Sequence, residues 1–217
     1  GGTAANSVPD SAKAIIHAAD YDEIKAKLAD FRERTGYKLS AKGRGKSLEI
    51  AAEGVAAHGA TPWKGVNAIS VLMQFLRELG VAAEDMKDFI RFYCDKIGME
   101  VGGESLGCGF SDEISGKLVL NVGMIHLDEE AARLTVNIRY PISCTDEQVY
   151  EAMMPLLNQY DMGIVKLNHQ APIYTPMDSH LVRVLTDVYR RHTGDRETQP
   201  LVIGGGTYAR AVPNAVA

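Results

Sequence analysis

The stretch "SLEIAAEGVAAHGATPWKGVNAISVLMQFLRELG", residues 47–80, decides the fold because it passes from a strand through a loop into a helix. Its first part alternates, and Leu48, Ile50 and Ala52 share one face, as in a half-buried strand. After the loop, apolar residues recur at helical spacing until Gly80, a residue typical of helix ends. The stretch therefore predicts a sheet with a helix packed on one face.

The segments on either side of this stretch are also predicted to be strands and helices in succession. Before the stretch we predict a strand over residues 13–20 and a helix over residues 20–36 that Asp20 caps. A second strand follows over residues 37–43, and the turn "KGRGK" joins it in a hairpin to the strand that begins at Ser47. After it we predict a helix, two paired strands and a later strand; these are residues 83–97, 117–127, 132–141 and 163–170. Thr145 and Gln148 form a capping-box pattern before one more helix, which Pro155 should kink or shorten.

This order predicts an α+β fold with two ferredoxin-like units, each a sheet with helices on one face. The units occupy about residues 1–100 and 101–173, and together they form one domain over residues 1–173. The character of the sequence then changes, so we expect residues 174–217 to be part of an α/β domain.

Two patterns support that change. "DSHLVRVLTDVYRRHTG", residues 178–194, predicts an amphipathic helix, and "PLVIGGGTYAR", residues 200–210, predicts a buried strand that runs into a glycine loop. The chain also begins at Gly1 without a methionine and stops in the apolar segment "AVPNAVA". Natural termini are usually more polar, so we expect a piece of a longer protein.

The composition is that of an ordinary globular protein, with 46% hydrophobic and 24% charged residues among 217. A formal net charge of −5 argues against nucleic-acid binding, and the chain contains no apolar run of membrane-spanning length. The three cysteines, Cys94, Cys108 and Cys144, are widely spaced and odd in number. We therefore expect reduced thiols in a cytoplasmic protein, not a disulfide framework or a zinc cluster.

The segment "HLDEE", residues 126–130, has the residue types of a metal site. His126 and Asp128 share one face of a strand, and two glutamates follow. However, the segment lies where one strand turns into the next, and acidic residues at a hairpin tip are usually solvated. Metal sites also draw ligands from several elements, so we expect no metal ligands here.

Three other sites could bind an anion. Gly204, Gly205 and Gly206 allow backbone N–H groups to converge on a carboxylate or phosphate, with Thr207 and Arg210 beside them; a tight turn explains the same glycines equally well. Arg139 ends a strand on its polar face, where it is either a surface arginine or a bidentate carboxylate clamp. His58 is a solvated loop histidine, a helix-start histidine or a hydrogen-bond donor to an oxyanion.

Four segments together resemble one family, in the same order along the chain. They are "NSVPD" (6–10), "AAHGATPWKGVNA" (56–68), "NIRYP" (137–141) and "VIGGGTYARAVPN" (202–214). The chain resembles the peptidase V type dipeptidases, within the dinuclear zinc aminoacylase/carboxypeptidase superfamily. In that family a lid domain interrupts a catalytic domain that binds two zinc ions. The resemblance implies that residues 1–173 are the lid, that the zinc ligands lie outside this chain, and that the chain alone is inactive.

The resemblance also implies roles for single residues. His58 would donate a hydrogen bond to the carbonyl oxygen of a dipeptide as it becomes an oxyanion, and Asn6 would help to hold the substrate there. Arg139, the loop from Gly204 to Thr207, and nearby Arg210 would bind the free C-terminal carboxylate.

The resemblance further implies a monomeric parent protein, because both lid halves are in one chain; the isolated chain exposes apolar surface through which it can associate. Two alternatives remain. One is a related deacylase or aminopeptidase, which differs in whether the substrate needs a free amino terminus. The other is a non-catalytic ferredoxin-like module that binds a small carboxylate without any other domain.

Overall fold

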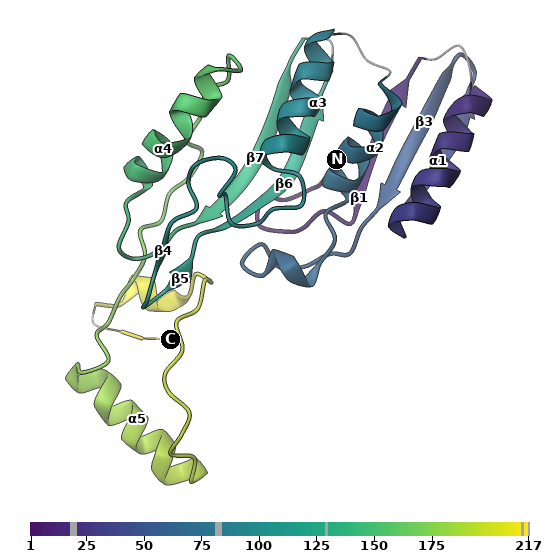
Figure 1. Ribbon diagram of the computed structural model, residues 1–217. Helices are drawn as coiled ribbons and strands as arrows, with labels where there is room; N and C mark the ends of the chain where they lie inside the picture. The colour runs from purple at the N-terminus through teal and green to yellow at the C-terminus, as the bar shows by residue number, and fades with distance from the viewer. Residues whose placement is uncertain (18–20, 81–83, 129, 214, 217) are drawn as a thin grey trace.

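The computed structural model describes the chain except residues 18–20, 81–83, 129, 214 and 217, and its architecture is α+β, as the sequence predicts (Figure 1). Parts of the sequence predictions fall on the undescribed residues: the end of the predicted strand 13–20, the helix cap at Asp20, the start of the second helix near Ala83, and Glu129 of "HLDEE". No helix in the described part of the chain has the length and apolar character that crossing a membrane requires.

The first half of the chain forms a three-stranded antiparallel sheet with the order β1-β3-β2. Its elements are β1 (Ser11–Ile16), α1 (Tyr21–Thr35), β2 (Lys38–Arg44) and β3 (Ser47–Glu53). The predicted face of β3 is confirmed, because Leu48, Ile50 and Ala52 are all buried. The three strands follow the strand-helix-strand-strand order of the predicted unit.

The loop after β3 leads through the short 3-10 helix η1 (Pro62–Lys64) into α2 (Ala68–Leu79). Asn67 caps α2 through its side-chain oxygen, which accepts hydrogen bonds from the N–H groups of Ile69 and Ser70. Gly80 ends the helix with φ of 66°, a left-handed conformation that glycine adopts without strain. The predicted helix over this segment is therefore confirmed, and α2 packs on β1, β3 and the next helix, α3 (Glu84–Lys96).

The second half is built on an antiparallel pair, β6 (Val119–Leu127) and β7 (Ala132–Arg139), which confirms the predicted pairing. A small hairpin of β4 (Ser111–Asp112) and β5 (Gly116–Lys117) precedes it. Thr145 and Gln148 form the predicted capping box at the start of α4 (Asp146–Asn158). Pro155 lies inside α4, and the helix continues beyond it to Asn158.

The two halves share one hydrophobic core. It extends from Ile24 of α1 through α2 and α3 to Leu120 of β6 and Val149 of α4. The N-terminal residues also run along β6, where Gly1 and Ile125 exchange backbone hydrogen bonds of 2.8 and 2.9 Å. The beginning of the chain is therefore held between the two sheets.

The C-terminal part contains α5 (His180–Thr193), which confirms the predicted amphipathic helix and lies apart from both sheets (Figure 1). The short 3-10 helix η2 (Tyr208–Ala211) follows. Two strand predictions are wrong, because residues 163–170 and 200–210 join no strand ladder in the described structure. Leu201, predicted to be buried, is 83% exposed. A strand needs a hydrogen-bonding neighbour, and no neighbouring described strand pairs with either segment.

Candidate functional site

His58 and Asn6 lie side by side although 52 positions separate them in the sequence (58 minus 6). Ser7 forms an antiparallel bridge with His58, and the N–H of Gly59 donates to the carbonyl oxygen of Asn6 at 2.8 Å. Gly59 is needed at this contact, because a Cβ there would lie 2.9 Å from the carbonyl carbon and oxygen of Asn6. The glycine after the histidine thus allows the two loops to meet.

The hydrogen bonds of His58 decide which ring nitrogen carries its proton. The N–H of Ala60 donates to Nδ1 of His58 at 3.0 Å, so Nδ1 is an acceptor. A neutral imidazole has one donor and one acceptor, and its proton is therefore on Nε2. The side chain is exposed, so His58 offers an Nε2–H donor at the surface of the loop.

Arg139, at the end of β7, is held by two partners. Its Nε donates to Oδ1 of Asn137 at 3.1 Å, and its Nη1 contacts the carbonyl oxygen of Gly204. Burial lowers the pKa of Arg139, but an arginine side chain keeps its charge at neutral pH. The guanidinium group is therefore a fixed positive charge beside the glycine loop.

The glycine loop lies between the histidine loop and Arg139. A Cβ on Gly204 would be 3.4 Å from Cβ of Ala60 and 3.7 Å from Cδ of Arg139. Thr207 caps η2, since its hydroxyl oxygen accepts from the N–H of Ala209 at 3.3 Å. None of the three glycines has a positive φ, so the loop does not adopt the alternating right- and left-handed conformation of an anion nest.

The structure brings all the residues predicted from the sequence to one open cleft, whose volume is about 3040 Å³. These lining residues are Asn6, His58, Arg139, Gly204, Gly205, Gly206, Thr207 and Arg210. Pockets fitted to small molecules have volumes of roughly 300–1,000 Å³. The cleft is larger than that, so the described residues around it do not enclose a small ligand.

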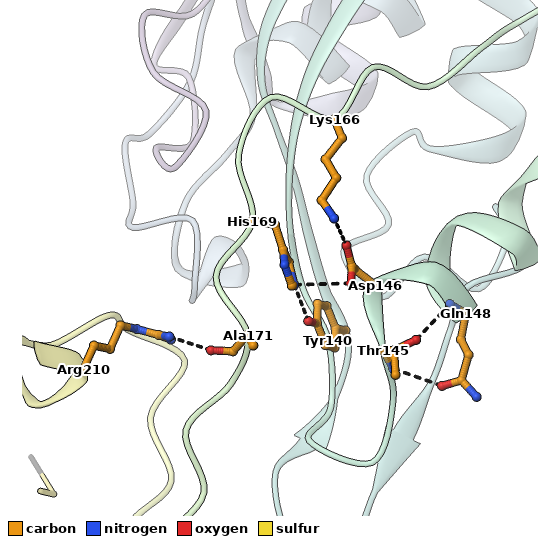
Figure 2. Close-up of polar contacts among 8 residues, drawn as sticks. All are labelled: Tyr140, Thr145, Asp146, Gln148, Lys166, His169, Ala171 and Arg210. Atoms are coloured by element: carbon orange, nitrogen blue, oxygen red, sulfur yellow. Dashed lines mark hydrogen bonds and ion pairs between the residues drawn. The ribbon is translucent and has the colours of Figure 1, made fainter. Parts of the chain in front are cut away.

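A network of charged and polar side chains lines the same cleft and was not predicted from the sequence (Figure 2). The hydroxyl of Tyr140 contacts Nε2 of His169 at 2.6 Å, and that nitrogen lies 3.5 Å from Oδ1 of Asp146. Nζ of Lys166 contacts Oδ2 of the same carboxylate, and this hydrogen bond holds the pKa of Asp146 below its usual range. No motif around His169 in the sequence indicates these contacts.

This network fastens residues 163–170 to the start of α4, and the connection continues towards Arg210. Nη1 of Arg210 donates to the carbonyl oxygen of Ala171 at 2.5 Å, two residues beyond His169 (Figure 2). At the start of α4, the sequence contains the capping box of Thr145 and Gln148. This pattern predicts where the helix begins, but it does not indicate that the side chain of Asp146 is buried.

The segment "HLDEE" begins inside β6, which contains His126 and Leu127. Nε2 of His126 contacts Oδ2 of Asp128 at 2.7 Å, while Oδ1 accepts from the N–H groups of Glu130 and Ala131 at 2.9 Å each. These hydrogen bonds lower the pKa of Asp128. Glu129 lies outside the described residues. Among the residues that are described, no group of three His, Cys, Asp or Glu side chains could hold a metal ion.

Comparison with known proteins gives matches along nearly the whole chain. Residues 42–161 match the family model of the peptidase dimerisation domain of M20 peptidases. The chain is 32% identical over 214 residues to a "Putative dipeptidase" of Staphylococcus epidermidis and 32% identical over 213 residues to "Putative dipeptidase YtjP" of Bacillus subtilis. Each match covers 98% of this chain but 45% of the relative, so the chain spans about half the length of these proteins.

Proposed function

Because this chain belongs to the peptidase dimerisation domain family of the M20 peptidases, we propose that it is the lid and part of the substrate site of a zinc-dependent dipeptidase. Relatives named as dipeptidases match 98% of the chain, which supports this proposal. In it, residues 1–173 are the lid, with halves near 1–100 and 101–173, and residues 174–217 begin the returning catalytic segment.

The observation that carries the proposal is the meeting of His58, Asn6 and the Arg139–Gly204 pair at one cleft. Nε2–H of His58 is the donor, and a peptide carbonyl oxygen that gains negative charge during hydrolysis is the acceptor. A donor fixed before reaction stabilises such an oxyanion more than the ground-state carbonyl. Removing one donor of this kind costs about 3 kcal/mol in comparable sites. Asn6 adjoins the same position and helps to hold the substrate there.

The two arginines of the cleft, Arg139 and Arg210, are suited to bind the C-terminal carboxylate of the substrate. Arginine has five N–H donors, and the contacts of Arg139 with Asn137 and Gly204 engage two of them. A carboxylate can therefore bind to the free edge of its guanidinium group. We propose that Arg139 and the loop Gly204–Thr207 bind the C-terminal carboxylate of a dipeptide, with Arg210 adding positive charge nearby. A fixed carboxylate site would also measure substrate length.

The described residues do not fit a zinc site, since no three potential ligands come together among them. We therefore propose that two zinc ions bind to parts of the longer protein outside this chain, and we route no step through them. In the same proposal the isolated chain is inactive, and the parent protein is a cytoplasmic monomer whose single chain supplies both lid halves.

The test compares three proteins: the full-length parent, its His58→Ala variant and this 217-residue chain. We expect dipeptide hydrolysis by the parent, a roughly 100-fold lower kcat for His58→Ala at unchanged zinc content, and no hydrolysis by the chain alone. His126→Ala is the matched control, because His126 is also exposed but lies at a hairpin tip. Zinc binding and hydrolysis by the isolated chain, or an unchanged kcat for His58→Ala, would refute the proposal.

One observation favours a second candidate. Two arginines on an open cleft could bind a small carboxylate without any catalytic domain, as a ferredoxin-like binding module would. Calorimetry of the isolated chain with amino acids and dipeptides separates the two functions, because the lid proposal expects no measurable heat of binding. A related N-acyl amino acid deacylase is distinguished in the parent by activity towards substrates whose amino terminus is blocked.

A further inference from the structure

The turn that carries Asn6 is held by a buried side chain of β6. Asn121 is only 2% exposed, and its Nδ2 donates to the carbonyl oxygens of Ala5 at 2.8 Å and Ser7 at 3.0 Å. These two carbonyl groups lie on either side of Asn6. The primary amide has two N–H groups, so one side chain of the second half of the chain fixes both ends of this short turn.

The backbone of β6 adds a second fixed contact. The pairing of β6 with β7 is irregular between Val122 and Met124, which places Gly123 in a bulge. A Cβ on Gly123 would lie 2.4 Å from the carbonyl oxygens of both Ala4 and Ala5. The N-terminal segment therefore packs directly against the backbone of β6. Asn121 and Gly123 together hold this segment in place, and we call these two residues its seat.

The seat is connected to His58 through backbone contacts alone. Ser7, whose carbonyl accepts from Asn121, forms the bridge with His58. The N–H of Val8 donates to the carbonyl of Ala57 at 2.9 Å, and that of Gly59 donates to Asn6 at 2.8 Å. Residues before and after His58 are thus hydrogen-bonded to the turn that Asn121 holds, so a shift of this turn moves the imidazole with it.

We propose that Asn121 is a positioning residue for the pair of Asn6 and His58. It touches neither substrate nor imidazole; it sets where the loop presents the Nε2–H donor. This inference rests on the proposed function only for its effect on catalysis, because the positioning itself can be measured in the isolated chain. The arrangement requires an amide here: an aspartate of the same size has no N–H to donate and would face two carbonyl oxygens.

The first experiment measures amide hydrogen exchange in this chain. In Asn121→Ala and Asn121→Asp, we expect exchange at Gly59 to rise about tenfold relative to exchange at Val71 in the same sample. Val71, whose N–H bonds within the start of α2, reports stability of the core and corrects for it. Should Asn121→Asp not fold, Asn121→Ala alone decides the result.

Tyr93→Phe is the matched control. It removes a buried hydrogen bond of 2.8 Å to Ser70 in the same core, and it leaves in place both hydrogen bonds from Asn121 to the turn of Asn6. A merely structural role for Asn121 would give the same exchange ratio at Gly59 in Asn121→Ala and in Tyr93→Phe, and that equality would overturn the inference. A ratio that rises only in the Asn121 variants supports it.

The second experiment measures kinetics of the full-length parent. If Asn121 positions a donor that acts in the transition state, Asn121→Ala lowers kcat about tenfold, changes KM by less than about twofold and leaves zinc content intact. An unchanged kcat in Asn121→Ala, beside a low kcat in His58→Ala, would overturn this inference alone. If His58→Ala itself keeps full activity, the proposed function fails, whereas the exchange result still decides whether Asn121 holds the turn.

Discussion

Gly59 lies where the loop of His58 meets the turn of Asn6. A Cβ at this position would approach the carbonyl group of Asn6 to 2.9 Å, closer than side chains normally come to backbone. Gly59→Ala must therefore separate the two loops, and overpacking of this kind costs about 1–3 kcal/mol. We expect the free energy of unfolding to fall by that amount in urea titrations of the isolated chain.

Gly43→Ala is the control for this substitution. A Cβ on Gly43, in β2, would meet no atom within 4 Å, so added bulk there has no steric cost. Its stability should stay within about 0.5 kcal/mol of wild type. Equal effects of the two substitutions would mean that the contact between Gly59 and Asn6 is loose and does not fix His58.

Asp146 should make stability depend on pH. Its hydrogen bond with Lys166 holds the pKa of the carboxyl group below its usual range. A group with a lowered folded pKa stabilises the protein above its unfolded pKa, about 3.9 for aspartate, and this stabilisation is lost as the pH falls through the folded pKa. We expect wild type to lose more unfolding free energy than Asp146→Asn between neutral and strongly acidic pH.

The measurement is a series of urea titrations at stepwise lower pH. Asp10→Asn is the control, because it makes the same substitution at an exposed aspartate in another part of the chain. If Asp146→Asn and wild type lose stability in parallel on acidification, the ion pair with Lys166 does not form in solution.

At the scale of elements, α4 carries a proline in its interior. Pro155 is exposed and cannot donate a hydrogen bond to the carbonyl of Glu151, one turn earlier. An interior proline lowers helix stability by about 3 kcal/mol relative to alanine. Proline also reduces the conformational entropy of the unfolded chain, which stabilises the folded protein by less than about 1 kcal/mol. Pro155→Ala should therefore raise the free energy of unfolding by about 2 kcal/mol, measured by thermal or urea unfolding.

Glu151→Ala provides the comparison on the same exposed surface of α4. It leaves the helix hydrogen bonds unchanged and should alter stability by no more than about 0.5 kcal/mol. A loss of stability in Pro155→Ala would show that the proline ring has packing contacts that outweigh the missing backbone hydrogen bond.

The helices could be predicted because their signals are local. Gly80 and Gly194 end α2 and α5 with φ of 66° and 74°, and the Thr145–Gln148 pair forms a complete capping box. Strands were predicted correctly in the hairpins β2–β3 and β6–β7, where the partner follows closely. The strand β1 was also predicted, although its partner β3 is more distant, whereas the short hairpin β4–β5 was not. Residues 163–170 and 200–207 pair with no strand in the described structure, and residues 208–210 begin η2. Strand pairing depends on distant parts of the chain that composition does not reveal.

The candidate site shows the same limit. His58, Asn6 and Arg139 could be selected from their motifs, but their supports could not. Asn121 reaches Ala5 across 116 positions, and Lys166 reaches Asp146 across 20. Such partners depend on how segments distant in the sequence pack together, and the sequence around each gives no sign of the contact.

For the whole molecule, α5 leaves an apolar stripe uncovered in the described structure. Val184, Leu185, Val188 and Tyr189 recur at helical spacing and each exposes between 38% and 46% of its surface. Contiguous exposed apolar patches promote association. We therefore expect the sedimentation coefficient of the isolated chain to rise with concentration.

Two added charges test whether α5 causes that association. Leu185→Glu combined with Val188→Glu should make the sedimentation coefficient independent of concentration, whereas Ile114→Glu, at an exposed isoleucine outside α5, should not. In the full-length parent we propose that the catalytic domain covers this stripe, so burying two glutamates there should destabilise the protein. If the double variant lowers neither the association of the chain nor the stability of the parent, α5 is not a buried face of the enzyme, and the assignment of residues 174–217 to the catalytic domain fails.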